Sequence, residues 1–162
     1  MSGTLTAVLF DVDGTLVDSN YLHAVSWWEA FIQAGHDVPM ARIHRTIGMG
    51  SDQLLDALLR AALAADDAID EATSSADVER SKPAPDLVQV ALDKARVRPD
   101  AAVFVGDTIW DVQACGKAGV PCVGLLSGGI SRAELLDAGA AEVYEGPAEL
   151  LDALPRSMLG RG

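Results

Sequence analysis

Cations, aromatic residues and long apolar runs are all scarce in this chain. Twelve Lys and Arg stand against 24 Asp and Glu in 162 residues, which gives a formal net charge of −12, and only 5% of the residues are aromatic. Nucleic acid and membranes are therefore not expected as partners, because nucleic acid and anionic lipid repel an acidic surface. No apolar stretch approaches the roughly 20 residues that span a bilayer. A small anionic ligand stays compatible with this charge if cations lie within its site.

Cysteine is almost absent as well. Cys115 and Cys122 are the only two, and they do not form a C-x-x-C pair. We interpret both as reduced packing residues of a cytoplasmic protein, with a disulfide between them as the minor alternative. No cationic segment followed by an apolar one opens the sequence, so we expect no signal peptide.

Short apolar strands alternate with amphipathic helices along most of the sequence. Strands are expected at 7–10, 101–106, 122–127 and 142–144, and helices at 21–33, 52–65, 85–95, 110–119, 132–138 and 147–154. Between 66 and 84 the pattern weakens, with a faint strand signal at 69–73. Strands and helices that alternate over short links predict an α/β fold with a doubly wound, mostly parallel, Rossmann-like sheet.

Acidic residues follow two of these strands. Asp11 ends the first, with Asp13 two residues later, and Asp107 ends the strand at 101–106, with Asp111 four residues later. The carboxyl ends of parallel strands meet at one edge of the sheet, where ligands bind. Oxygen ligands of this kind suit Mg²⁺. An EF-hand loop is excluded, because it needs Gly at its sixth position and Glu at its twelfth.

Three motifs in this order resemble the haloacid dehalogenase-like superfamily of hydrolases. They are FDVDGTLVDS at 10–19, SKPAPD at 81–86 and VGDTIWD at 105–111. The helical stretch after the first motif is similar to the small cap of the phosphoglycolate phosphatase and β-phosphoglucomutase branch. The resemblance implies an α/β core at 1–18 and 66–156, a short, incomplete helical cap at 19–65 and a tail at 157–162.

The resemblance also implies a role for each matching residue. Asp11 would be the nucleophile that forms an aspartyl-phosphate, and Asp13 the acid and base. Asp11, Asp107 and the main-chain carbonyl of Asp13 would hold Mg²⁺, and Lys82 would pair with Asp11 and the phosphoryl oxygens. The supporting residues would be Gly14 and Thr15 in the turn and Asp111 beside the metal.

One part of the family pattern has no room in this chain. Only about thirty residues separate Ser51 from Lys82, whereas the family places there the second half of the cap, a strand that ends in a phosphate-binding Thr or Ser, and a helix. Either the sequence ATSS supplies the hydroxyl, or a whole unit is missing and 69–83 is the family's next strand and the loop that contains Lys82; we favour the second. A missing unit would unpair the edge of the Asp11 strand unless 69–73 or a second copy pairs with it. The candidate hydroxyl ligands are Thr73, Ser74 and Ser75.

The leading expectation is a Mg²⁺-dependent phosphatase that hydrolyses a small phosphorylated metabolite. A phosphomutase is the enzymatic alternative, and a catalytically silent remnant that binds metal or phosphate, or a phosphate-accepting regulatory domain, is the alternative from another class. A homo-oligomer stays open. Surface or packing roles are expected for His23, His36 and His44. Trp27 and Trp28 are expected mainly to pack within their helix, with a substrate-facing role for one of them left open.

Overall fold

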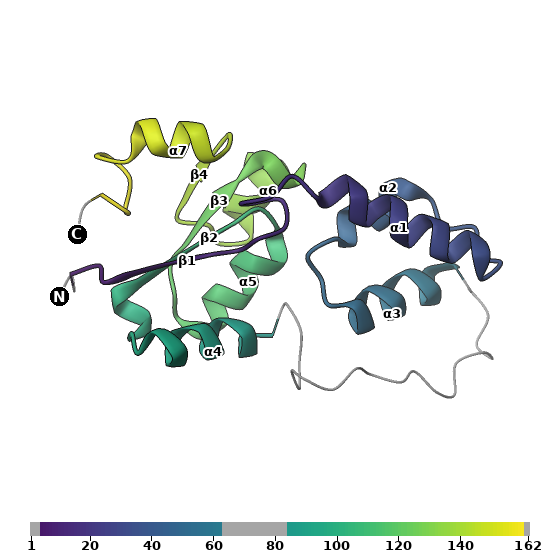
Figure 1. The fold of residues 1–162 in the computed structure, drawn as a ribbon, viewed down its shortest axis with the longest axis horizontal. Helices are drawn as coiled ribbons and strands as arrows, with labels where there is room; N and C mark the ends of the chain where they lie inside the picture. The colour runs from purple at the N-terminus through teal and green to yellow at the C-terminus, as the bar shows by residue number, and fades with distance from the viewer. Residues whose placement is uncertain (1–3, 63–83, 161–162) are drawn as a thin grey trace.

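A parallel sheet forms the centre of the fold, as the sequence predicts. The computed structural model describes residues 4–62 and 84–160. Its sheet contains β1 (Ala7–Phe10), β2 (Ala102–Gly106), β3 (Cys122–Leu125) and β4 (Glu142–Tyr144), all parallel and in that order. The described part of the chain is thus an α/β protein, which confirms the predicted fold class (Figure 1).

Helices cover the two faces of the sheet unequally. The faces of β2 and β3 that carry Phe104 and Cys122 pack against α4 (Asp86–Ala95), α5 (Ile109–Ala118) and α6 (Arg132–Asp137). The opposite face packs against α7 (Pro147–Ala153) and the segment after it. Figure 1 shows α7 on one side of the sheet and α4 and α5 on the other.

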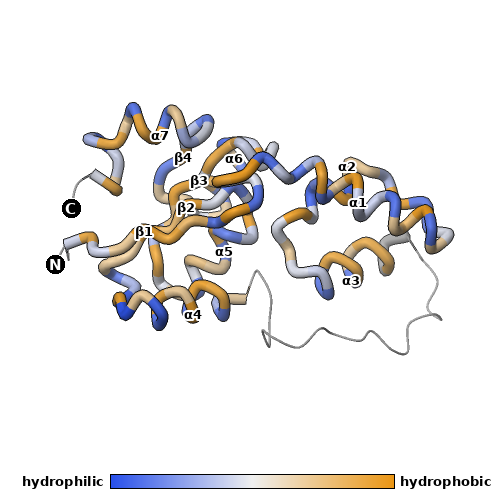
Figure 2. The backbone as a smooth tube through the Cα atoms, viewed as in Figure 1, coloured by the Kyte–Doolittle hydropathy of each residue, from blue (hydrophilic) through white to orange (hydrophobic). Residues whose placement is uncertain are grey.

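The two central strands are apolar on both faces. Every residue of β2 and β3 is buried, and Figure 2 shows mainly hydrophobic colour along both. A parallel strand covered on both faces needs a continuous apolar run rather than an alternating one. The sequences AVFVG and CVGL meet this requirement, and their residues place the core on either side of the sheet.

The remaining helices form a separate group, α1 (Asn20–Gln33), α2 (Met40–Thr46) and α3 (Ser51–Ala62), which we call the helical group. Figure 1 shows these three helices beside one another, and their side chains form an apolar cluster of their own. Sequence analysis missed α2, because seven residues with Ile43 as the one buried side chain give too short a periodic pattern. The cluster consists of Ala24, Phe31, Val38, Ile43, Ile47, Leu54 and Leu58.

Among the described residues, none of the helices has the length and apolar character needed to span a bilayer.

Capping residues set the ends of several helices. The Ser131 hydroxyl accepts a hydrogen bond from the Glu134 amide, and the Glu134 carboxylate accepts one from the Ser131 amide, so α6 begins with a capping box at its predicted N-cap. Arg96 ends α4 in the left-handed conformation, with φ of 55°. A glycine would adopt this conformation with less strain.

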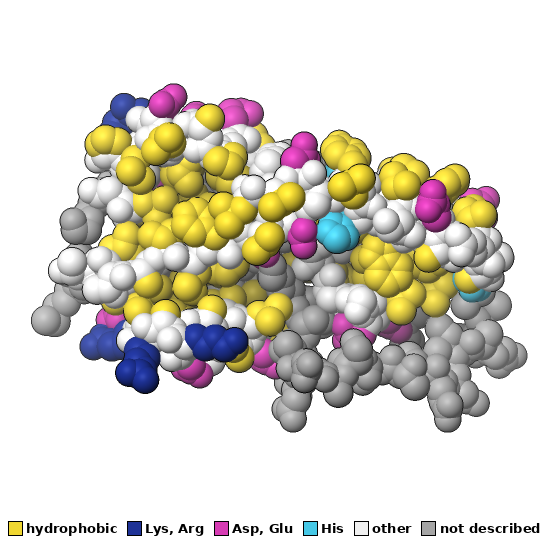
Figure 3. All heavy atoms as spheres, in the orientation of Figure 1, with side chains coloured by type: hydrophobic (Ala, Val, Ile, Leu, Met, Phe, Trp, Pro, Cys, Tyr) yellow, Lys and Arg dark blue, Asp and Glu magenta, His cyan; other side chains and the backbone are white. Residues whose placement is uncertain are grey.

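The strand β1 lies at an edge of the described sheet. It pairs with β2, and the side chains of Val8 and Phe10 are 36% and 47% exposed. Figure 3 shows hydrophobic side chains gathered over this part of the sheet, between α7 and α4. The predicted alternative partner strand at 69–73 lies outside the described residues, so its pairing stays a prediction.

Candidate functional site

A tight turn after β1 places the first acidic motif at the sheet edge. The Gly14 amide donates to the Val17 carbonyl at 2.6 Å, and the amides of Leu16 and Val17 both donate to the Val12 carbonyl at 2.9 Å. Gly14 has a φ of 78°, and a Cβ at this position would collide with Oδ2 of Asp107. Glycine is required here both for the backbone conformation and for the close approach to Asp107.

Asp107 lies at the centre of the site and is fully buried. The Thr15 hydroxyl donates to its Oδ1 at 3.2 Å, and the Asn20 side-chain amide donates to its Oδ2 at 2.7 Å. The main chain of Gly128 passes so close that a Cβ there would collide with the same carboxylate. Residues from three separate parts of the chain therefore fix the position of Asp107.

Three carboxylates converge at this point. One oxygen from each of Asp11, Asp107 and Asp111 lies within 4.8 Å of the other two. Asp111 is also buried, and its Oδ2 accepts hydrogen bonds from the Thr108 hydroxyl at 2.6 Å and the Thr108 amide at 3.1 Å. It thus completes the capping box of α5 and lies among the acidic residues at the same time. An all-oxygen set of this kind fits a hard cation such as Mg²⁺.

Burial, together with the neighbouring acids, raises the pKa of Asp107. Burial raises this pKa from 3.8 to about 6; the hydrogen bond from Asn20 lowers it, the charges of Asp111 and Asp11 raise it further, and the bond from Thr15 lowers it. A bound cation would favour the ionised form instead. A cation at this position would therefore offset the repulsion among these acids.

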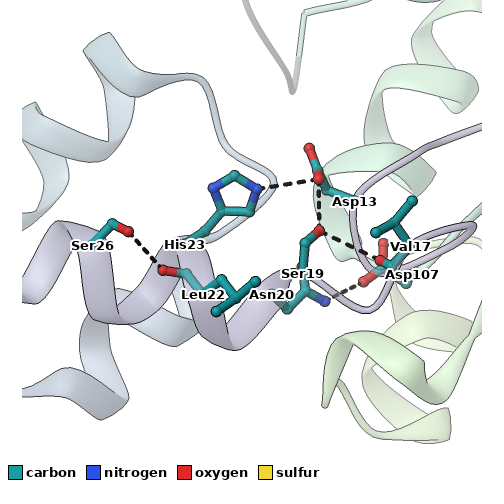
Figure 4. Close-up of polar contacts among 8 residues, drawn as sticks. All are labelled: Asp13, Val17, Ser19, Asn20, Leu22, His23, Ser26 and Asp107. Atoms are coloured by element: carbon teal, nitrogen blue, oxygen red, sulfur yellow. Dashed lines mark hydrogen bonds and ion pairs between the residues drawn. The ribbon is translucent and has the colours of Figure 1, made fainter.

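Asp13 occupies the solvent side of the site. Its Oδ1 accepts a hydrogen bond from the Ser19 hydroxyl at 2.6 Å and lies 3.1 Å from Nε2 of His23 (Figure 4). Sequence analysis gave His23 a surface or packing role and did not anticipate this contact. The available signal was the spacing from Ser19 to His23, because residues four apart share one face of a helix.

A pocket of about 270 Å³ opens beside these acids. Asp11 and Asp13 line one side of it, and residues of the helical group line the other. Trp27 packs partly against the apolar cluster of the helical group but also borders the pocket, so its role is not limited to packing. The lining from the helical group includes Asn20, His23, Trp27, Ile47, Gly48, Met49 and Leu54.

Comparisons with known proteins agree with this geometry. The model of the family described as haloacid dehalogenase-like hydrolase matches residues 58–125. Phosphoglycolate phosphatase of Escherichia coli K12 is 37% identical over 79 residues, which are 48% of this chain and 31% of that protein. (S)-2-haloacid dehalogenase 4A of Burkholderia cepacia is 32% identical over 101 residues, which are 62% of this chain and 41% of that protein.

A solved structure extends the match to nearly the whole chain. A hydrolase from Pseudomonas syringae superposes with a TM-score of 0.83 and 29% identity, over 93% of this chain and 98% of that one. The chain therefore resembles the haloacid dehalogenase-like hydrolases in sequence over residues 58–125 and in fold over nearly its whole length. The matched regions span about a third to two fifths of the length of the two curated relatives.

The structure brings the four acidic residues predicted from this resemblance into one place. Asp11, Asp107 and Asp111 form the carboxylate group, and Asp13 lies beside them at the pocket. Gly14 and Thr15 both approach Asp107, as supporting residues would. The other predicted residues lie outside the described part of the chain, namely Lys82, Thr73, Ser74 and Ser75.

The helical group also contacts helix α6 and the N-cap residue of α5. The Arg45 guanidinium of α2 donates to the Glu134 carboxylate of α6. This bond, together with those from the Ser131 side chain and backbone, lowers the pKa of Glu134 to about 2. A Cβ on Gly48 would lie 2.7 Å from the Thr108 side chain, so the two parts approach closely there.

Proposed function

We propose that this chain is a Mg²⁺-dependent phosphatase that hydrolyses a small phosphorylated metabolite through an aspartyl-phosphate on Asp11. The observation that carries the proposal is the convergence of three carboxylates beside a pocket that Asp13 also lines. The name of the phosphoglycolate phosphatase relative points to the same substrate class.

The proposed metal ligands are Asp11, Asp107 and the main-chain carbonyl of Asp13, with Asp111 beside them. The fit rests on the donor set, since three carboxylate oxygens lie within 4.8 Å of one another and oxygen is the ligand that Mg²⁺ prefers. The bound ion would neutralise these acids, so that the Asp11 carboxylate can approach a phosphoryl anion.

Asp11 and Asp13 divide the chemistry between them. An Asp11 oxygen forms a bond to phosphorus while the bond to the leaving-group oxygen breaks, and Asp13 gives that oxygen its proton. Asp13 then removes a proton from a water molecule, whose oxygen attacks the phosphorus and releases phosphate and free Asp11. The Ser19 hydroxyl and the His23 ring hold Asp13 in place for both transfers.

The helical group is the proposed cap, within the proposed limits 19–65. It lines one side of a pocket of about 270 Å³, and this volume lies just below the range of ordinary ligand sites, about 300 to 1,000 Å³. A compact substrate follows from this size. Lys82 is the proposed cation that pairs with the phosphoryl oxygens, and one of Thr73, Ser74 and Ser75 is the proposed hydroxyl ligand.

The test is Mg²⁺-dependent release of phosphate from a panel of small phosphomonoesters that includes phosphoglycolate. Asp11→Asn should lower the rate by at least about 10³-fold, because it removes the nucleophile. Asp18→Asn is the matched control, since Asp18 is exposed in the same loop and does not line the pocket. This variant should release phosphate at the rate of the unchanged chain.

Two outcomes would contradict the proposal. Folded protein that releases no more phosphate than its Asp11→Asn variant would leave a phosphatase fold without phosphatase activity. A substrate converted to its isomer without release of phosphate would instead indicate a phosphomutase.

A further inference from the structure

Asn20 joins the beginning of the helical group to the centre of the carboxylate site. It is the first residue of α1, and only 3% of its surface is exposed. Its Nδ2 donates to Oδ2 of Asp107 at 2.7 Å (Figure 4). A buried amide that bonds to a fully buried carboxylate is held firmly, because moving either group would leave polar atoms without partners.

The other half of the Asn20 amide has no comparable role. Its Oδ1 is buried and has no hydrogen-bond partner among the described residues. A buried acceptor without a partner costs about 1–3 kcal/mol, so retaining it needs a compensating interaction. The bond to Asp107 is the interaction that the amide does make, and it determines where the side chain lies.

The bond from Asn20 completes the orientation of the Asp107 carboxylate. Thr15 donates to Oδ1, and Asn20 donates to Oδ2. With one donor on each oxygen, the plane of the carboxylate cannot rotate without breaking a hydrogen bond. Each oxygen still has a lone pair for another partner.

Polar side chains at the start of α1 form hydrogen bonds to the site instead of capping the helix. Ser19 is the N-cap residue, yet its hydroxyl makes no capping hydrogen bond and donates to Asp13 instead. A missing cap costs a helix about 1 kcal/mol. Three residues near this helix start, Ser19, Asn20 and His23, therefore direct their polar atoms to Asp13 and Asp107.

We propose that Asn20 is a positioning residue of the metal centre, which orients Asp107 and thereby couples the entry into α1 to the binding of a divalent cation. The inference rests on the proposed function in one respect, namely that the ligand of Asp107 is such a cation. Because α1 begins at Asn20, this hydrogen bond joins the first residue of the helical group to the proposed metal ligand Asp107.

The direct test is the Mg²⁺ affinity of the whole chain, measured by titration calorimetry without substrate. Asn20→Leu keeps the branched shape of the side chain but removes the donor to Oδ2, and should weaken Mg²⁺ binding by about 10- to 100-fold, as loss of an outer partner of a metal ligand does. Ser26→Ala is the matched control, because Ser26 also lies on α1 but donates to the Leu22 carbonyl of its own helix. It should bind Mg²⁺ as the unchanged chain does.

A second variant and a second measurement keep the test decisive. Asn20→Ala, which admits water in place of the amide, replaces Asn20→Leu if the leucine variant does not fold, as judged by circular dichroism. In an active chain, phosphate release by the variant should recover at high Mg²⁺, since Asn20 orients a ligand and does not touch the reacting atoms. A purely structural role would lower stability and leave the Mg²⁺ affinity of the folded variant unchanged.

The results separate this inference from the proposed function. A folded variant with Mg²⁺ affinity within twofold of the unchanged chain would overturn the role of Asn20, as would an unchanged chain that binds no Mg²⁺. Mg²⁺ binding that depends on Asn20 in a chain that releases no phosphate would support the role of Asn20 and contradict the phosphatase.

Discussion

The two sides of β1 differ sharply. On one side, β1 pairs with β2, and the loops after these strands bring Asp11 and Asp107 together among buried partners. On the other side, within residues 4–62 and 84–160, Val8 and Phe10 remain more than a third exposed. The described partners of the carboxylate site therefore lie on the β2 side of β1, whereas full burial of the strand would need a cover on its open side. The site and the burial of β1 thus depend on different sides of the strand.

The largest expected effect concerns the carboxylate site on the β2 side of β1. With Mg²⁺ removed, the pKa of Asp107 is about 6 in the folded chain, above its ordinary 3.8. A carboxyl with a raised folded pKa costs stability as pH rises from about 4 to about 6, here by up to about 3 kcal/mol, and the cost stays constant above that range. Asp107→Asn should not show this loss. Urea unfolding in EDTA at several pH values measures it.

Added Mg²⁺ should restore the stability of the unchanged chain above pH 6 and leave the Asp107→Asn variant unaffected. Parallel pH profiles for the two proteins in EDTA would contradict the assigned environment of Asp107.

The next effect compares β1 at the edge of the described sheet with its inner neighbour β2, using one residue type. Val8 and Val103 are neighbours in the β1–β2 ladder, but they are 36% and 4% exposed. Val103→Ala should lower the free energy of unfolding by about 2 kcal/mol, because it leaves a cavity, and Val8→Ala by less than about 1 kcal/mol. Equal losses for the two variants would mean that the outer side of β1 is covered in solution.

The smallest effect concerns the contact between the helical group and α6. Arg45→Gln should raise the pKa of Glu134 from about 2 toward the ordinary carboxyl range, because the Arg45 hydrogen bond is the largest cause of the lowered value. Carboxyl chemical shifts followed by NMR during an acid titration measure this change. Arg42→Gln on the same helix is the control. A Glu134 pKa that stays near 2 without Arg45 would show that the contact does not form in solution.

Much of the fold could be predicted from local sequence patterns. The strands near Phe10 and Val105 are continuous apolar runs, and the strand-end rule then places Asp11 and Asp107 together. Ser131 and Glu134 mark a helix start in the sequence and form a capping box in the structure. The strands, the capping box and the position of each acid after its strand depend on residues close together in the chain, so a sequence pattern can report them.

The contacts of α1 with the site could not be predicted in this way. Asn20 and Asp107 are 87 residues apart, and no motif pairs them. Ser19 reads as an ordinary N-cap, and the structure shows that its hydroxyl bonds to Asp13 instead. The hydrogen-bond partners of such residues depend on how the helical group packs, which is a tertiary property.

The most direct test of the account is whether Asp11 carries the phosphoryl group during turnover. The chain, mixed with Mg²⁺ and a substrate labelled in its phosphate, is quenched in acid during steady-state hydrolysis. The account predicts label on the protein that hydroxylamine releases, as expected of an acyl phosphate, and none on the Asp11→Asn variant. Release of phosphate with no label on the protein at any time would contradict it.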